Sequence, residues 1–112
     1  MEVKVKETRL ADETYQDELI NQLLKLKEND QLDDLVKTFK TILTSIGKDM
    51  TDDDMAKINE EFNWGRCDFD VIKFLTDEKY QNGVMKQYLQ ENNNFEDLVM
   101  LVRLGFSYVY NK

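Results

Sequence analysis

The side chains in this sequence that could do chemistry are mainly carboxylates, and they gather in one segment. Between Asp49 and Asp70 there are eight acidic residues and two basic ones, Lys57 and Arg66, so this segment carries −6 of the formal net charge of −8. Charge concentrated in this way produces a directional field that steers basic partners. The pattern predicts a docking face built from Asp49, Asp52, Asp53, Asp54, Glu60, Glu61, Trp64, Arg66, Asp68 and Asp70.

The other residue types do not favour catalysis. The chain has no histidine, a single cysteine (Cys67) and only two serines, Ser45 and Ser107. The commonest general base is therefore absent, and no Ser/His or Cys/His nucleophile pair can form. No glycine-rich phosphate loop is present either. We expect a protein that is not an enzyme, with no catalytic residues and no cofactor.

The three consecutive aspartates also raise the question of a metal site. The stretch TILTSIGKDMTDDDMAKINEEF followed by GRCDFDVIKFL, within residues 41–75, resembles the linker and second half of an EF-hand pair. A calcium loop needs oxygen ligands at alternating positions, whereas Trp64 and Arg66 stand where such oxygens should be. We therefore expect no bound metal. The resemblance implies instead a calcium-free lobe that could hold a partner helix in an apolar groove.

Helix capping accounts for much of the aspartate run. Thr51 is a good N-cap residue, and Asp54, three positions later, completes a pattern like a capping box. Asp52 and Asp53 then fall in the first helical turn, where the helix dipole favours each negative charge by about 0.3–1 kcal/mol. Capping does not explain the carboxylates that continue to Asp70, and this remainder supports the docking hypothesis.

Aromatic residues near this segment and at the C-terminus each allow two interpretations. Trp64, the only tryptophan, is either a binding hot spot beside Arg66 or a cover over the edge of the core. The C-terminal aromatics Phe106, Tyr108 and Tyr110 either close the core or dock a partner. Cys67 is expected to be an inert, half-buried thiol.

The bulk composition limits the partners and the location. A net charge of −8 disfavours direct binding to nucleic acid and to anionic membranes, because both depend on basic residues. A basic protein surface is the complementary partner. One cysteine cannot form an internal disulfide, no apolar segment resembles a signal peptide, and no apolar run is long enough to span a membrane. We expect a cytoplasmic protein.

Hydrophobic periodicity predicts an all-α or mostly α fold of five to six short helices. The absence of proline and the presence of only four glycines argue against an all-β fold. The expected helices run from a Thr14 cap to a break at 28–31, over 32–46 with Gly47 as a left-handed stop, over 52–62, 68–76 and 79–90, and from 95 onward. Residues 1–10 are expected to be an arm or a short strand. Residues 2–6 could pair with 106–110 as a terminal β-ribbon, unless 106–110 continue the last helix.

Two stretches of the sequence resemble each other. YQDELINQLLK (15–25) aligns with YQNGVMKQYLQ (80–90), and ENDQLDDLV (28–36) aligns with ENNNFEDLV (91–99). Each stretch predicts a helix, a polar break and a second helix, which together form a helical hairpin. The similarity is compatible with an internal duplication and also with chance similarity between amphipathic helices.

These observations lead to one main hypothesis and two alternatives. The chain is expected to be a single domain over 1–112 that acts as a small, acidic, non-enzymatic binding module. We expect a regulator or inhibitor, of the kind encoded by phage or mobile elements, that docks on a basic surface of a nucleic-acid-handling protein and imitates nucleic-acid charge. The alternatives are the calcium-free adaptor that binds a partner helix and a structural subunit of a larger assembly. The sequence leaves the oligomeric state open.

Overall fold

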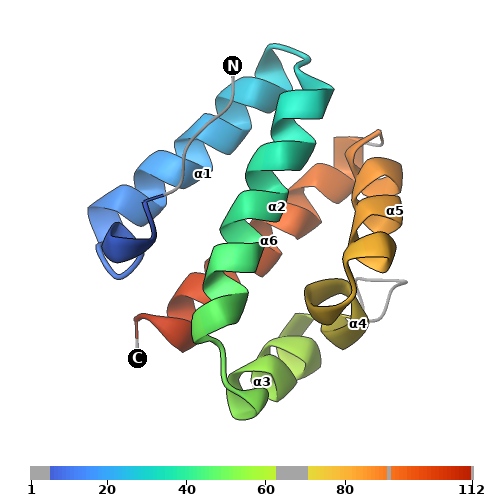
Figure 1. The fold of residues 1–112 in the computed structure, drawn as a ribbon. Coiled ribbons are helices and arrows are strands. Elements are labelled where there is room, and N and C mark those ends of the chain that lie inside the picture. The colour runs from blue at the N-terminus through green and yellow to red at the C-terminus, as the bar shows by residue number, and fades with distance from the viewer. Residues whose placement is uncertain (1–5, 63–70, 91, 112) are drawn as a thin grey trace.

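Six α-helices and one short 3-10 helix make up most of the computed structural model, which describes residues 6–62, 71–90 and 92–111. No strand occurs among these residues (Figure 1). The 3-10 helix is Glu7–Arg9, and the α-helices are α1 (Glu13–Glu28), α2 (Leu32–Asp49), α3 (Asp52–Phe62), α4 (Val71–Thr76), α5 (Glu78–Leu89) and α6 (Asn92–Val109). The prediction of a mostly helical fold is confirmed.

Helices α2 and α6 form the centre of the domain. Each of them packs against the other and against α1 and α5, while α3 and α4 contact one another near one end of this central pair. In Figure 1, α1 and α5 lie on opposite sides of α2, and α6 passes behind it. The Cα radius of gyration is 12.9 Å, which agrees with the value of about 13 Å expected for one compact domain of this length.

The apolar stripe of α2 explains its central position. Phe39, Ile42 and Ile46 are fully shielded from solvent, as helical spacing along one face requires. Phe39 meets Phe95 of α6 edge to face, with ring centroids 5.9 Å apart and planes at 73°. Such aromatic contacts add to the apolar area that the two helices bury together.

The ends of the first two helices differ from the predicted ones. Asp12, and not Thr14, is the N-cap of α1, because its carboxylate accepts the Thr14 N–H at 2.9 Å. The predicted break at 28–31 contains Asp30 in a left-handed conformation with φ of 57°. Aspartate tolerates this conformation better than most residues, so α1 ends here. Gly47, predicted as a left-handed stop, instead lies inside α2, which continues to Asp49.

The C-terminal segment is helical and not a strand. Residues 106–109 belong to α6, so the predicted β-ribbon is wrong on this side, and residues 2–5 lie outside the described part of the chain. Burial explains the outcome, because Leu98, Val102 and Phe106 repeat at helical spacing and all three are buried. The alternation in FSYVY is overridden by this packing.

The two similar sequence stretches begin with matching contacts. DETYQ (12–16) opens α1 and DEKYQ (77–81) opens α5. Both aspartates accept backbone N–H groups of the first turn, and both glutamines are buried and donate to the carbonyl of a preceding buried apolar residue. A cation also lies over each tyrosine ring, at 4.6 Å for Arg9 on Tyr15 and 5.0 Å for Lys73 on Tyr80.

Candidate protein-docking face

The N-terminus of α3 is fixed by a reciprocal cap. The Thr51 hydroxyl accepts the Asp54 N–H at 3.1 Å, and the Asp54 carboxylate accepts the Thr51 N–H at 3.2 Å. This arrangement is the predicted capping box. Asp54 is only 3% exposed, so its carboxylate supports the helix and is not presented to a partner.

Five of the predicted docking residues are exposed around α3. Asp49 ends α2, Asp52 and Asp53 lie in the first turn of α3, and Glu60 and Glu61 lie near its C-terminal end. We call these five residues the acidic face. The two pairs on α3 are eight residues apart, which corresponds to about 12 Å along the helix axis. The other predicted residues, Trp64, Arg66, Asp68 and Asp70, lie outside the described residues, as does Cys67.

Two tyrosines of the C-terminal segment hold carboxylates of the acidic face. The Tyr110 hydroxyl donates to Asp49 at 2.6 Å, and the Tyr108 hydroxyl donates to Glu61. A hydrogen bond to an ionised acceptor is stronger than one between neutral groups. Sequence reasoning treated the C-terminal aromatics and the acidic segment as separate surfaces, whereas the structure brings α3 and α6 together.

A shallow hollow lies within the acidic face. Lys57, Glu60, Glu61 and Tyr108 line it, and its volume is about 300 Å³. Lys57 pairs with Asp53 at 3.1 Å, but both side chains are largely exposed, and ion pairs of this kind contribute little to stability. The hollow presents the carboxylates of Glu60 and Glu61 and the Tyr108 ring beside Lys57, and the two carboxylates and the ring favour a cationic side chain.

The acidic surroundings change the ionisation of Tyr108. The hydrogen bond to Glu61 raises the pKa of Tyr108 above its ordinary value of 10.0, and partial desolvation and the charges of Glu61 and Glu60 act in the same direction. Because the pKa of Tyr108 is higher in the folded chain than in the unfolded chain, the stabilisation from its hydrogen bond to Glu61 is fully present below pH about 10. It is lost as the pH rises through the raised pKa.

In the folded protein, Tyr108 should ionise at a higher pH than a tyrosine of the unfolded chain. We expect Tyr108→Phe to abolish this high-pH ionisation. Ultraviolet titration of tyrosinate in the wild type and the variant measures this difference. Glu61→Gln keeps an acceptor but removes the charge, and it should lower the pKa of Tyr108 toward its ordinary value. If the ionisation that is lost in Tyr108→Phe has the pKa of a tyrosine in the unfolded chain, the hydrogen bond between Tyr108 and Glu61 is not formed.

The described residues offer no obvious metal centre. Among them, no group of three or more histidine, cysteine, aspartate or glutamate side chains is placed to hold a metal ion. In the same part of the chain, no helix is both long and apolar enough to cross a membrane.

Comparisons with known proteins found no matching family model, no matching curated protein and no matching solved structure.

Proposed function

We propose that this protein is a non-enzymatic module that binds a basic surface of another protein through its acidic face. The observation that carries the proposal is the pair of tyrosine–carboxylate contacts, Tyr110 to Asp49 and Tyr108 to Glu61. These contacts orient exposed carboxylates in advance, so less conformational entropy is lost when a partner binds them. The net charge of −8 adds long-range attraction to a basic partner.

The proposed partner is a protein that handles nucleic acid, and the proposed role is regulation or inhibition. Proteins that bind phosphate backbones expose lysine and arginine clusters. A row of carboxylates from Asp52 to Glu61 can occupy such a cluster in place of phosphates. Arginine is the side chain best suited to the hollow beside Glu60 and Tyr108, because its planar guanidinium can pair with a carboxylate and stack on a ring.

Salt dependence tests this proposal directly. The immobilised protein is used to capture partners from the cells in which it occurs, and a captured protein is identified by mass spectrometry and purified. We expect the dissociation constant of that complex to rise tenfold or more between low salt and 1 M salt, because the screening length falls to about 3 Å at 1 M.

The main alternative predicts a different result. An adaptor that holds an apolar helix in a groove would lose little affinity at high salt, because burial of apolar surface does not depend on opposite charges. A dissociation constant that is unchanged at 1 M salt would therefore contradict docking through the acidic face. A structural subunit would instead show a mass in solution that rises with its own concentration.

A further inference from the structure

The cleft between α1 and α6 contains a pair of amide side chains, the buried Gln16 and the exposed Asn111. Gln16 Nε2 donates to the Leu10 carbonyl at 2.6 Å and to Asn111 Oδ1 at 3.1 Å, and Asn111 Nδ2 donates back to Gln16 Oε1 at 2.9 Å. Gln16 is 4% exposed, so both polar ends of its amide are satisfied within the protein. About 230 Å³ of open volume remains in this cleft.

An equivalent cleft lies between α2 and α5, and its glutamine is not fully paired. Gln81 corresponds to Gln16 in the DEKYQ repeat, is 5% exposed, and donates Nε2 to the Phe74 carbonyl at 3.2 Å. Within the described residues, no donor reaches Gln81 Oε1, and one N–H of its amide is also unused. Among the described residues, every fully buried polar side-chain atom has a hydrogen-bond partner, so the unpaired Gln81 Oε1 is not fully buried. Because Gln81 lines the cleft, we infer that this oxygen faces the cleft.

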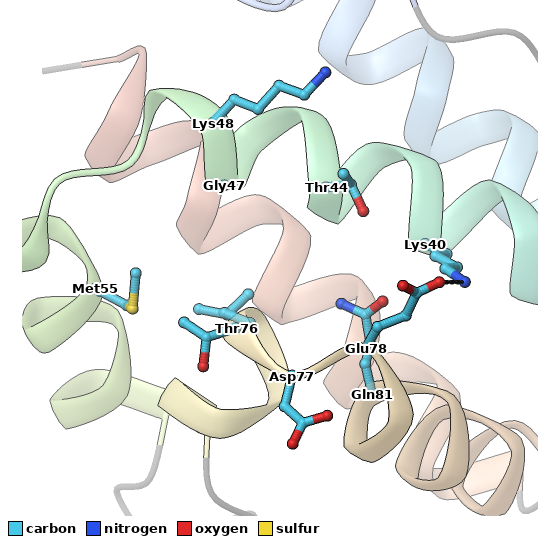
Figure 2. A pocket seen from close by; sticks show the side chains of 10 residues that line it. Lys40, Thr44, Gly47, Lys48, Met55, Thr76, Asp77, Glu78 and Gln81 are labelled. Atoms are coloured by element: carbon cyan, nitrogen blue, oxygen red, sulfur yellow. Dashed lines mark hydrogen bonds and ion pairs between the residues drawn. The ribbon is translucent and has the colours of Figure 1, made fainter.

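The alignment of the repeats explains why the second cleft is open. Continuing the alignment of 28–36 with 91–99 places Lys48 at the position of Asn111. A lysine side chain has no carboxamide, and Figure 2 shows Lys48 extending away from Gln81, so Lys48 does not fill the place that Asn111 fills beside Gln16. The open volume is about 450 Å³, roughly twice that of the first cleft.

The lining of the second cleft suits a small polar group on an apolar stem. Thr44 of α2 and Gln81 of α5 extend into the space between their helices (Figure 2). Met55 and Leu75 supply apolar surface, and the ion pair between Lys40 and Glu78 borders the opening. This combination of apolar walls with a few placed polar groups is typical of a ligand site.

We propose that this cleft binds the carboxamide of an asparagine or glutamine side chain from a partner protein, as the first cleft binds Asn111. The incoming amide would donate to Gln81 Oε1 and accept the unused N–H of Gln81, which reproduces the reciprocal pair at Gln16. A carboxylate has no donor for Gln81 Oε1, and an ammonium group has no acceptor for the N–H. This site is separate from the acidic face and does not depend on the function proposed for that face.

Nuclear magnetic resonance titration with N-acetyl-asparagine N-methylamide tests the site on the full chain. We expect a saturable shift of the Gln81 side-chain amide signal, with a dissociation constant on the order of 1 mM for so small a probe. The aspartate analogue should bind at least about tenfold more weakly, because it leaves a polar group of the site unpaired. Free asparagine that binds more tightly than the capped probe would overturn the assignment to a protein partner.

Two variants separate loss of the site from loss of the fold. Gln81→Met removes both amide contacts, and Thr44→Trp fills the cleft from an exposed position on α2 without changing a buried residue. Each should weaken probe binding at least about tenfold. Thr41→Trp, exposed on the same helix but outside the cleft lining, should bind the probe like the wild type. No shift in the wild type, or equal binding by Thr44→Trp and Thr41→Trp, would overturn the proposal.

Discussion

Replacing Asp52, Asp53, Glu60 and Glu61 by lysine is expected to weaken partner binding at least about 100-fold. Each replacement exchanges an attractive contact with a basic surface for a repulsive one, and like charges brought together at an interface cost several kcal/mol. The four exchanges also raise the formal net charge from −8 to zero, which removes the long-range attraction. Titration calorimetry with the purified partner measures the dissociation constants of the two proteins.

The fold should survive these four changes. All four side chains are exposed, and the cap of α3 is made by Thr51 and Asp54, which are retained. Lysines in the first turn oppose the helix dipole at a cost of about 0.3–1 kcal/mol each. The helical circular dichroism signal should therefore persist with a modest loss of stability. Unchanged affinity in a folded variant would contradict the role of the acidic face.

The largest effect on stability is expected from Gly105→Leu. A Cβ atom at position 105 would lie 3.2 Å from Cγ2 and 3.3 Å from Cδ1 of Ile46, which is fully buried in the core. Ile46 has little room to move, so a leucine would force α2 and α6 apart. We expect a loss of about 1–3 kcal/mol in the free energy of unfolding, as is typical of overpacked cores. Urea unfolding followed by circular dichroism measures it.

Gly83 provides the matched control for this change. It lies inside α5, is exposed, and has open space where a Cβ would be placed. Gly83→Leu should therefore stabilise the protein by about 0.5–1 kcal/mol, because glycine is a poor residue for a helix interior. If both leucine variants are equally stable, α2 and α6 do not cross closely at Gly105.

Local signals in the sequence predicted several elements well. The helix at 52–62 was predicted from Thr51, Asp54 and the apolar residues that follow, and α3 has these bounds and this cap. The stripe of α2 is similarly clear, because its apolar residues repeat at helical spacing and lie in the core. Caps and stripes depend on residues within a few positions of each other, so a sequence alone can reveal them.

Features that depend on distant contacts were predicted less well. The residues of FSYVY alternate like those of a strand, yet 106–109 continue α6. Phe106 extends the buried helical face that Leu98 and Val102 begin. Gly47 looks like a helix stop, but α2 continues past it to Asp49. Ile72 is a large apolar residue of α4, yet it is 41% exposed. In each case tertiary packing, which the sequence does not display, decides between local preferences.

The candidate sites show the same division. The exposed carboxylates of α3 could be predicted from charge density, but their contacts with Tyr108 and Tyr110 arise only when α3 packs against α6. The cleft at Gln81 was missed altogether. The sequence signal for this cleft was the pattern shared by DETYQ and DEKYQ, which places Gln16 and Gln81 at equivalent positions. Both glutamines are buried, but within the described part of the chain only Gln16 of the two has a second amide as its partner.

The most direct test of the central proposal compares two charge-matched variants in the same binding measurement. One carries lysine at Asp52, Asp53, Glu60 and Glu61, and the other carries lysine at the exposed acids Asp17, Glu18, Glu28 and Glu96, so both have a net charge of zero. We predict that the first variant binds the partner at least about tenfold more weakly than the second, because only the first replaces carboxylates of the acidic face, including Glu61, which Tyr108 holds. Equal dissociation constants for the two variants would show that net charge alone drives binding, and would contradict docking through the acidic face.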